Sequence, residues 1–221
     1  MDKKSVFSSP FFAVYFIALA LIIYYFVSYC FTFKYGFFDI EEVGITEVLT
    51  YLFYGVGLGI AVCFGKTLLN SPNRQNYCEI IFLWFAALMR EMGIQHWLTS
   101  HDTVVTKIRF FTSPTNPLYE KLTAAFLMLL VLFVLLSLII RNFKFLLKSI
   151  SEISPVGITI LTFLILAVLT QIADRTPAIY FKEHGAALSQ HILFVLKIFE
   201  EGGESMLPLL FGIGMYQYCN K

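Results

Sequence analysis

Ionisable side chains interrupt several long hydrophobic stretches of the sequence, and they are the residues whose types could support chemistry. They are Glu47, Arg90, Glu91, His96, Asp174, Arg175, Glu200, Glu201 and Glu204. A charged side chain near the centre of a bilayer costs about 2.5 to 3.5 kcal/mol, so each one must be paired, hydrated or functional.

Three of these acids lie in the last hydrophobic stretch, and at least two of them share one helical face. Glu204 follows Glu200 by four residues and Glu201 by three. Lys197 is spaced to neutralise either Glu200 or Glu201. With Glu91 there are more carboxylates than cations, so the excess charge must be protonated, hydrated or offset by a bound cation. We therefore predict a pocket that binds or conducts a cation or a cationic headgroup.

Two glycines lie between these acids. Gly202 and Gly203 remove side chains where a neighbouring helix or a bound group could approach the backbone closely. Together with Pro208, they predict a break in the helix. A broken helix at membrane depth commonly marks a binding site.

Each ionisable group also has a structural interpretation. Arg90 would hold helices together by pairing with a glutamate, since polar residues commonly join membrane helices. Glu47 fits a hydrated acid in a first helical turn, and Asp174 with Arg175 is typical of a helix end and loop start. A non-catalytic assembly or sensor subunit is therefore the second functional hypothesis.

The third hypothesis is an enzyme that uses a divalent metal. His96, His101 and His191 would supply nitrogen ligands, and Glu91 and Glu204 would supply oxygen ligands. Such a metal would activate water against a lipid or a lipid-linked substrate. The spacing matches no zinc-protease motif such as H-E-x-x-H, so the pattern favours this hypothesis least.

The composition places these residues in a membrane protein. Of the 221 residues, 58% are hydrophobic and 14% are charged, and the mean hydropathy is +0.74. Soluble domains carry about 25% charged residues. The net charge of +1 and the high apolar content exclude a nucleic-acid binder and a disordered chain.

Stretches long enough to cross about 30 Å of hydrocarbon predict an all-α, single-domain bundle of about six transmembrane spans. The spans cover residues 10–33, 45–65, 78–98, 118–140, 155–173 and 188–218. Basic residues gather in the short loops on the N-terminal side, which predicts that both termini are cytoplasmic. The ionisable groups then converge in the outer half of the membrane.

Both ends of the fourth span carry basic residues. At its inner end, Arg141, Lys144 and Lys148 recur at helical spacing, and anionic lipid headgroups would explain them. At its outer end, the loop that contains Phe110 and Phe111 would either place its rings in the acyl boundary or fold back over the bundle, and we favour the second.

Three segments resemble small bacterial polytopic membrane proteins that carry no assigned activity. They are residues 41–47 entering a span, residues 90–96, and residues 200–211. The resemblance covers part of the chain and implies the bacterial inner membrane, but implies nothing about chemistry. The expected partners are membrane lipids and either a second copy or another membrane subunit.

Overall fold

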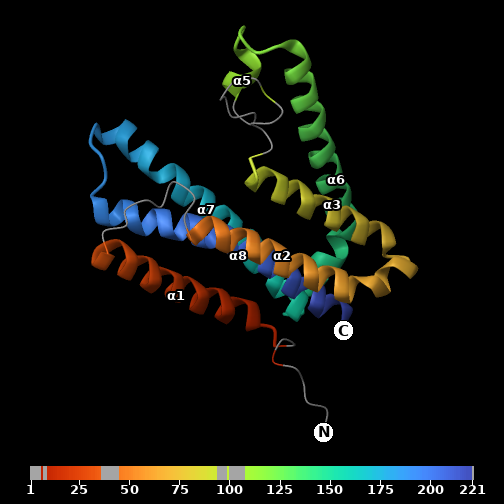
Figure 1. The fold of residues 1–221 in the computed structure, drawn as a ribbon. Coiled ribbons are helices and arrows are strands. Elements are labelled where there is room, and N and C mark those ends of the chain that lie inside the picture. Colours follow the sequence, from red (N-terminus) through yellow and green to blue (C-terminus); the bar gives the residue numbers. More distant parts are fainter. Residues whose placement is uncertain (1–5, 7–8, 36–44, 94–98, 100–107, 221) are drawn as a thin grey trace. The chain divides into compact units, whose positions relative to one another are not determined.

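The fold is helical throughout the part of the chain that the structure describes. The computed structural model describes residues 6, 9–35, 45–93, 99 and 108–220, and no strand occurs among them (Figure 1). The helices are α1 (Phe12–Tyr35), α2 (Ile45–Gly65), η2 (Lys66–Asn70), α3 (Arg74–Glu91), α5 (Ile108–Thr112), α6 (Leu118–Ser151), α7 (Pro155–His184) and α8 (Gln190–Cys219). The prediction of an all-α fold is confirmed.

Four of the described helical segments are long and apolar enough to cross a membrane. They are Phe12–Cys30, Val48–Leu69, Leu118–Ser151 and Pro155–His184, in α1, α2 with η2, α6 and α7. These segments support the prediction of a membrane protein. Six spans and the cytoplasmic position of both termini stay predictions.

The chain divides into two compact units, each of which is described by itself. Unit 1 comprises Met1–Thr67 and Phe145–Lys221, and unit 2 comprises Leu68–Lys144. Unit 1 therefore contains α1, α2, α7 and α8, while unit 2 contains α3, α5 and most of α6.

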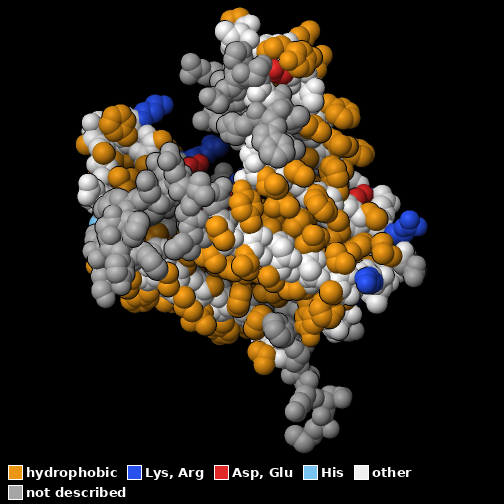
Figure 2. Space-filling view, in the orientation of Figure 1, with side chains coloured by type: hydrophobic (Ala, Val, Ile, Leu, Met, Phe, Trp, Pro, Cys, Tyr) orange, Lys and Arg blue, Asp and Glu red, His pale blue; other side chains and the backbone are white. Residues whose placement is uncertain are grey.

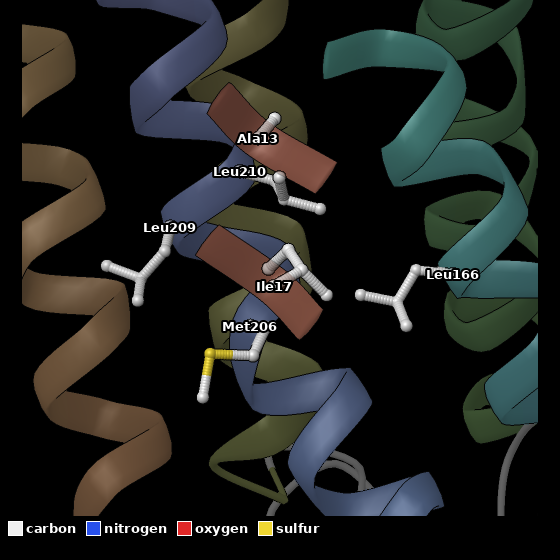
Figure 3. Packing of buried hydrophobic residues seen from close by; sticks show 6 residues of the cluster. All are labelled: Ala13, Ile17, Leu166, Met206, Leu209 and Leu210. Atoms are coloured by element: carbon white, nitrogen blue, oxygen red, sulfur yellow. The ribbon is translucent and has the colours of Figure 1, made fainter. Parts of the chain in front are cut away.

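In unit 1, α8 is the interior helix. It packs extensively on α2 and α7 and less extensively on α1, and its buried residues extend from Phe194 to Gln217. Figure 3 shows the centre of this packing, where Ala13 and Ile17 of α1 approach Leu210 of α8. Because the apolar helices α1, α2 and α7 all pack on α8, it carries more buried residues than any one of them in the described part of unit 1.

Small residues allow the neighbouring helices to approach α8 closely. A Cβ atom at Gly202 would lie 2.6 Å from Cδ1 of Tyr24, and one at Gly203 would overlap Cγ2 of Thr170. A Cβ at Gly212 would lie 3.2 Å from Cα of Gly57. The predicted close approach at Gly202 and Gly203 is confirmed.

The predicted break in this helix is wrong. α8 continues from Gln190 to Cys219 with Pro208 inside it. Proline removes one hydrogen bond from a helix interior and normally favours a kink. Here Pro208 is buried among residues that pack on α1, α2 and α7, and this packing keeps the segment helical.

α7 is longer than the span predicted for it. Ser154 caps its start by accepting a hydrogen bond from the backbone N–H of Gly157 at 3.1 Å, and Pro155 occupies the first turn. The predicted helix end at Asp174 and Arg175 is wrong, because α7 continues to His184. It ends where Gly185 adopts a left-handed conformation with φ of 65°.

Unit 2 combines a short helix with a long one. α3 has 18 residues and ends at Glu91, whereas the predicted span continued to residue 98, which lies outside the described residues. α6 has 34 residues, a length of about 51 Å, so it extends well beyond the predicted end at residue 140.

The segment before α6 folds back onto that helix. Phe110 is fully buried and clusters with Ala124 of α6. The side-chain amide of Asn116 donates a hydrogen bond of 2.8 Å to the carbonyl oxygen of Phe110. The Phe110 ring therefore packs inside unit 2, which agrees with the folded-back loop and not with a ring placed in lipid.

Candidate functional site

Two side-chain hydrogen bonds fix how α7 and α8 lie against each other. The hydroxyl of Thr159 donates to Oε1 of Gln217 at 2.7 Å, and Nε2 of Gln171 donates to Oε1 of Glu204 at 3.0 Å. Higher residue numbers on α7 thus pair with lower numbers on α8, so the two helices are antiparallel. This arrangement places Asp174 of α7 beside the acidic stretch of α8.

We define the acidic face as the four carboxylates Asp174, Glu200, Glu201 and Glu204. Nζ of Lys197 lies 3.4 Å from Oε1 of Glu201, and each of these two side chains is one third exposed. Asp174, Glu201 and Glu204 all lie within electrostatic range of Glu200, as does Lys197. The prediction that Lys197 neutralises one acid of this group is confirmed. Carboxylates outnumber lysines on the acidic face.

The predicted site residues of α7 face water or lipid. Asp174 and Arg175 are both exposed, within the continuous helix α7. Gln171, one turn before Asp174, is also exposed and bonds to Glu204.

Arg90 and Glu91 form an ion pair with each other. Nη2 of Arg90 lies 3.0 Å from Oε1 of Glu91, and Nε donates to the same oxygen at 3.1 Å. The Arg90 side chain is 59% exposed and that of Glu91 is 25% exposed. The predicted convergence of Glu91 with Glu204 stays a prediction, because these residues belong to different units.

The other predicted residues are only partly described. Glu47 lies in the first turn of α2, and its side chain lies outside the described part of the structure. His96 and His101 lie outside the described residues. His191 is exposed in the first turn of α8.

Metal binding finds no support in the described residues. Among them, no group of three or more His, Cys, Asp or Glu residues comes close enough to hold a metal ion. The acidic face is included in this statement. The predicted divalent site therefore depends on His96 and His101, which lie outside the described residues.

Sequence reasoning missed a polar cluster that joins α3 to α6 within unit 2. The guanidinium of Arg141 donates to both carboxylate oxygens of Glu79, at 3.0 and 3.1 Å. It also donates to the hydroxyl of Ser137 at 2.9 Å and to Oδ1 of Asn76 at 3.0 Å. Asn76 in turn donates to Oδ1 of Asn142 at 2.9 Å.

The spacing of these polar residues in the sequence was a signal for this cluster. Asn76 and Glu79 are three residues apart on one helix, and Ser137 and Arg141 are four apart on another, so each pair shares a face. The sequence analysis assigned Arg141 to lipid headgroups, whereas the structure directs four of its N–H donors to protein acceptors.

Comparison with models of protein families, with curated proteins and with solved structures gives no match for this chain. The resemblance to small bacterial membrane proteins therefore stays a prediction.

Proposed function

We propose that this protein is a multi-pass membrane protein that binds a cationic organic group at the acidic face of α7 and α8. The observation that carries the proposal is that Asp174 of α7 and Glu201 and Glu204 of α8 all lie within electrostatic range of Glu200, while Lys197 pairs with Glu201. A surface on which carboxylates outnumber basic side chains attracts cations. The predicted bacterial inner membrane, six spans and cytoplasmic termini belong to this proposal.

The position of the acidic face along α7 supports a ligand at the membrane surface. From Pro155 to Ala173, α7 is almost wholly apolar and rises about 28 Å, close to the thickness of the hydrocarbon core. Asp174 follows directly, and Glu204 lies at the level of Gln171. The acids then lie near the outer boundary of the hydrocarbon, where a headgroup or a soluble amine can reach them.

The spacing of the acids favours an organic cation over a metal ion. A bound metal needs several ligands within about 2.0 to 2.6 Å of one point, and no such group occurs in the described part of the chain. An ammonium group makes hydrogen bonds to carboxylates near 2.8 Å and also gains from charges that lie farther away. Amines therefore fit the acidic face better than divalent metals do.

Titration of purified full-length protein with spermidine and with ethanolamine tests the proposal. The protein is held in phosphatidylcholine nanodiscs, so that the lipid adds no net charge. We expect saturable binding that weakens at least ten-fold in the Asp174→Asn/Glu200→Gln double variant, since each charged hydrogen bond contributes about 1.5 to 3 kcal/mol. Glu183→Gln is the matched control, because Glu183 is exposed near the end of the same helix α7.

A second variant should change the affinity for amines in the opposite direction. Lys197→Gln removes the cation that pairs with Glu201, so amine binding should become tighter. Absence of saturable binding, or equal affinity in all variants, contradicts the proposal. Tight binding of zinc or magnesium in place of amines would favour the metal-enzyme hypothesis. Amine flux in proteoliposomes, lost in the double variant, would extend binding to transport.

The assembly or sensor hypothesis is the second candidate, and one observation favours it. Within unit 2, the ion pair between Glu79 of α3 and Arg141 of α6 joins two helices. If the acidic face has the same role, its variants should change the oligomeric state of the purified protein and leave amine binding at background level.

A further inference from the structure

A shallow hollow extends along one face of α6 in unit 2. Its lining residues are Phe133, Leu136, Ser137, Ile140 and Arg141. The three apolar residues are strongly exposed, at 70% for Phe133, 46% for Leu136 and 74% for Ile140. The hollow is thus apolar along most of its length and polar at one end, and Figure 2 shows how much of the visible surface is hydrophobic.

The polar end of the hollow is held in place by protein contacts. Arg141 donates hydrogen bonds to Glu79, Asn76 and the hydroxyl of Ser137, so its guanidinium is fixed against the start of α3. Bidentate pairing of this kind gives the guanidinium a defined orientation. The rim of the hollow at Arg141 is therefore rigid.

The same end carries additional positive charge. Lys144 follows Arg141 by three residues, so it continues the face of α6 that lines the hollow, and it is exposed. Arg74, in the first turn of α3, is exposed and lies two residues before Asn76, which bonds to Asn142 of α6. Arg74, Arg141 and Lys144 therefore outnumber Glu79, the acidic residue to which Arg141 bonds.

Length and charge together indicate the occupant. From Phe133 to Arg141 the helix rises about 12 Å, which accommodates much of an acyl chain. We propose that the hollow binds one anionic phospholipid, with an acyl chain against Phe133, Leu136 and Ile140. The headgroup phosphate then lies at the basic end, next to Lys144. Clusters of basic residues at the end of a membrane helix recognise anionic headgroups.

This site is independent of the acidic face, because it uses no residue of α7 or α8. Glu79 neutralises much of the charge on Arg141, so Lys144 contributes most of the attraction for the phosphate. A neutral substitution of Lys144 should therefore reduce the preference for an anionic headgroup without disturbing the contacts between α3 and α6.

Native mass spectrometry of the full-length protein in detergent tests the site. Phosphatidylglycerol and phosphatidylcholine with identical acyl chains are titrated separately, and the ratio of their affinities is measured. We expect wild type to prefer phosphatidylglycerol and Lys144→Gln to reduce that preference about five-fold, the typical contribution of one basic residue near a membrane surface. Lys182→Gln, which makes the same change of charge at the far end of α7, should leave the ratio unchanged.

The apolar part of the site has its own pair of variants. Ile140→Trp fills the hollow and should weaken the first lipid-binding step for both lipids, whereas Ile139→Trp changes an exposed neighbour that does not line the hollow and should have no effect. The proposal is overturned if wild type binds both lipids equally. It is also overturned if Lys144→Gln and Ile140→Trp match their controls.

Discussion

The contact between Gly203 and Thr170 gives the sharpest test of how α8 packs inside unit 1. In Gly203→Ala, the new methyl group would overlap Cγ2 of Thr170 and lie 3.3 Å from Cδ1 of Leu166. Thr170 is 1% exposed and Leu166 is 5% exposed, so neither side chain has free space into which to move.

The expected loss of stability follows from two opposing terms. Inserting a methyl group into a well-packed core costs about 1 to 3 kcal/mol, while replacing glycine by alanine inside a helix returns up to about 1 kcal/mol. We therefore expect Gly203→Ala to lower the free energy of unfolding by about 1 to 2 kcal/mol. Gly59→Ala is the control, because a Cβ at Gly59 meets no atom within 4 Å. It should leave stability unchanged or raise it slightly.

A compensating substitution identifies the atom responsible. Thr170→Ser removes Cγ2 and keeps the hydroxyl, which donates to the carbonyl oxygen of Ala167 at 3.1 Å. The double variant Gly203→Ala/Thr170→Ser should then recover most of the lost stability. Unfolding by sodium dodecyl sulfate in mixed micelles, followed by circular dichroism, measures all four proteins. Equal stability of Gly203→Ala and Gly59→Ala would refute the packing described for α8.

Three further predictions concern the polar contacts and the orientation of the chain. Glu79→Ala should destabilise the protein by about 1 to 3 kcal/mol, and a double-mutant cycle with Arg141→Ala should show coupling, because the pair is bidentate and Glu79 is 14% exposed. Thr159→Val should cost about 1 kcal/mol in the same unfolding assay, since it removes the buried hydrogen bond to Gln217. Ala187→Cys places a single cysteine between α7 and α8 in a chain whose other cysteines have been replaced. It should react with a membrane-impermeant maleimide added to intact cells. If this cysteine does not react, the proposed orientation is reversed.

The starts of the helices were easier to predict than their ends. The predicted span 45–65 coincides with α2, and the predicted starts at Leu118 and Pro155 coincide with those of α6 and α7. Local signals such as the cap at Ser154 fix these starts. The helices α6 and α7 continue beyond the predicted span ends at residues 140 and 173, because backbone hydrogen bonding does not depend on hydropathy and continues until a residue such as Gly185 stops it.

The candidate site was predicted as a set of residues, but the partners of each residue were not. Spacing along one helix predicted that Lys197 pairs with either Glu200 or Glu201, and the structure pairs it with Glu201. It was not sufficient to pair Gln171 with Glu204 or Glu79 with Arg141, because these contacts depend on which helices are neighbours and on their register. Sequence periodicity gives the face of a helix and leaves the identity of the facing helix open.

Glu204 separates the two leading functional hypotheses, because its charge and its hydrogen bond can be removed independently. Glu204→Gln loses the negative charge but keeps a carbonyl oxygen that can accept from Nε2 of Gln171. Glu204→Leu loses both, and should cost about 1 to 2 kcal/mol in unfolding free energy. If the carboxylate serves ligand binding, Glu204→Gln weakens amine binding several-fold at unchanged stability. If it serves only to join α7 to α8, Glu204→Gln behaves like wild type in every assay and Glu204→Leu alone is impaired. A Glu204→Leu protein as stable as wild type would contradict the joining role, since the Gln171 contact would then contribute nothing to the packing of these helices.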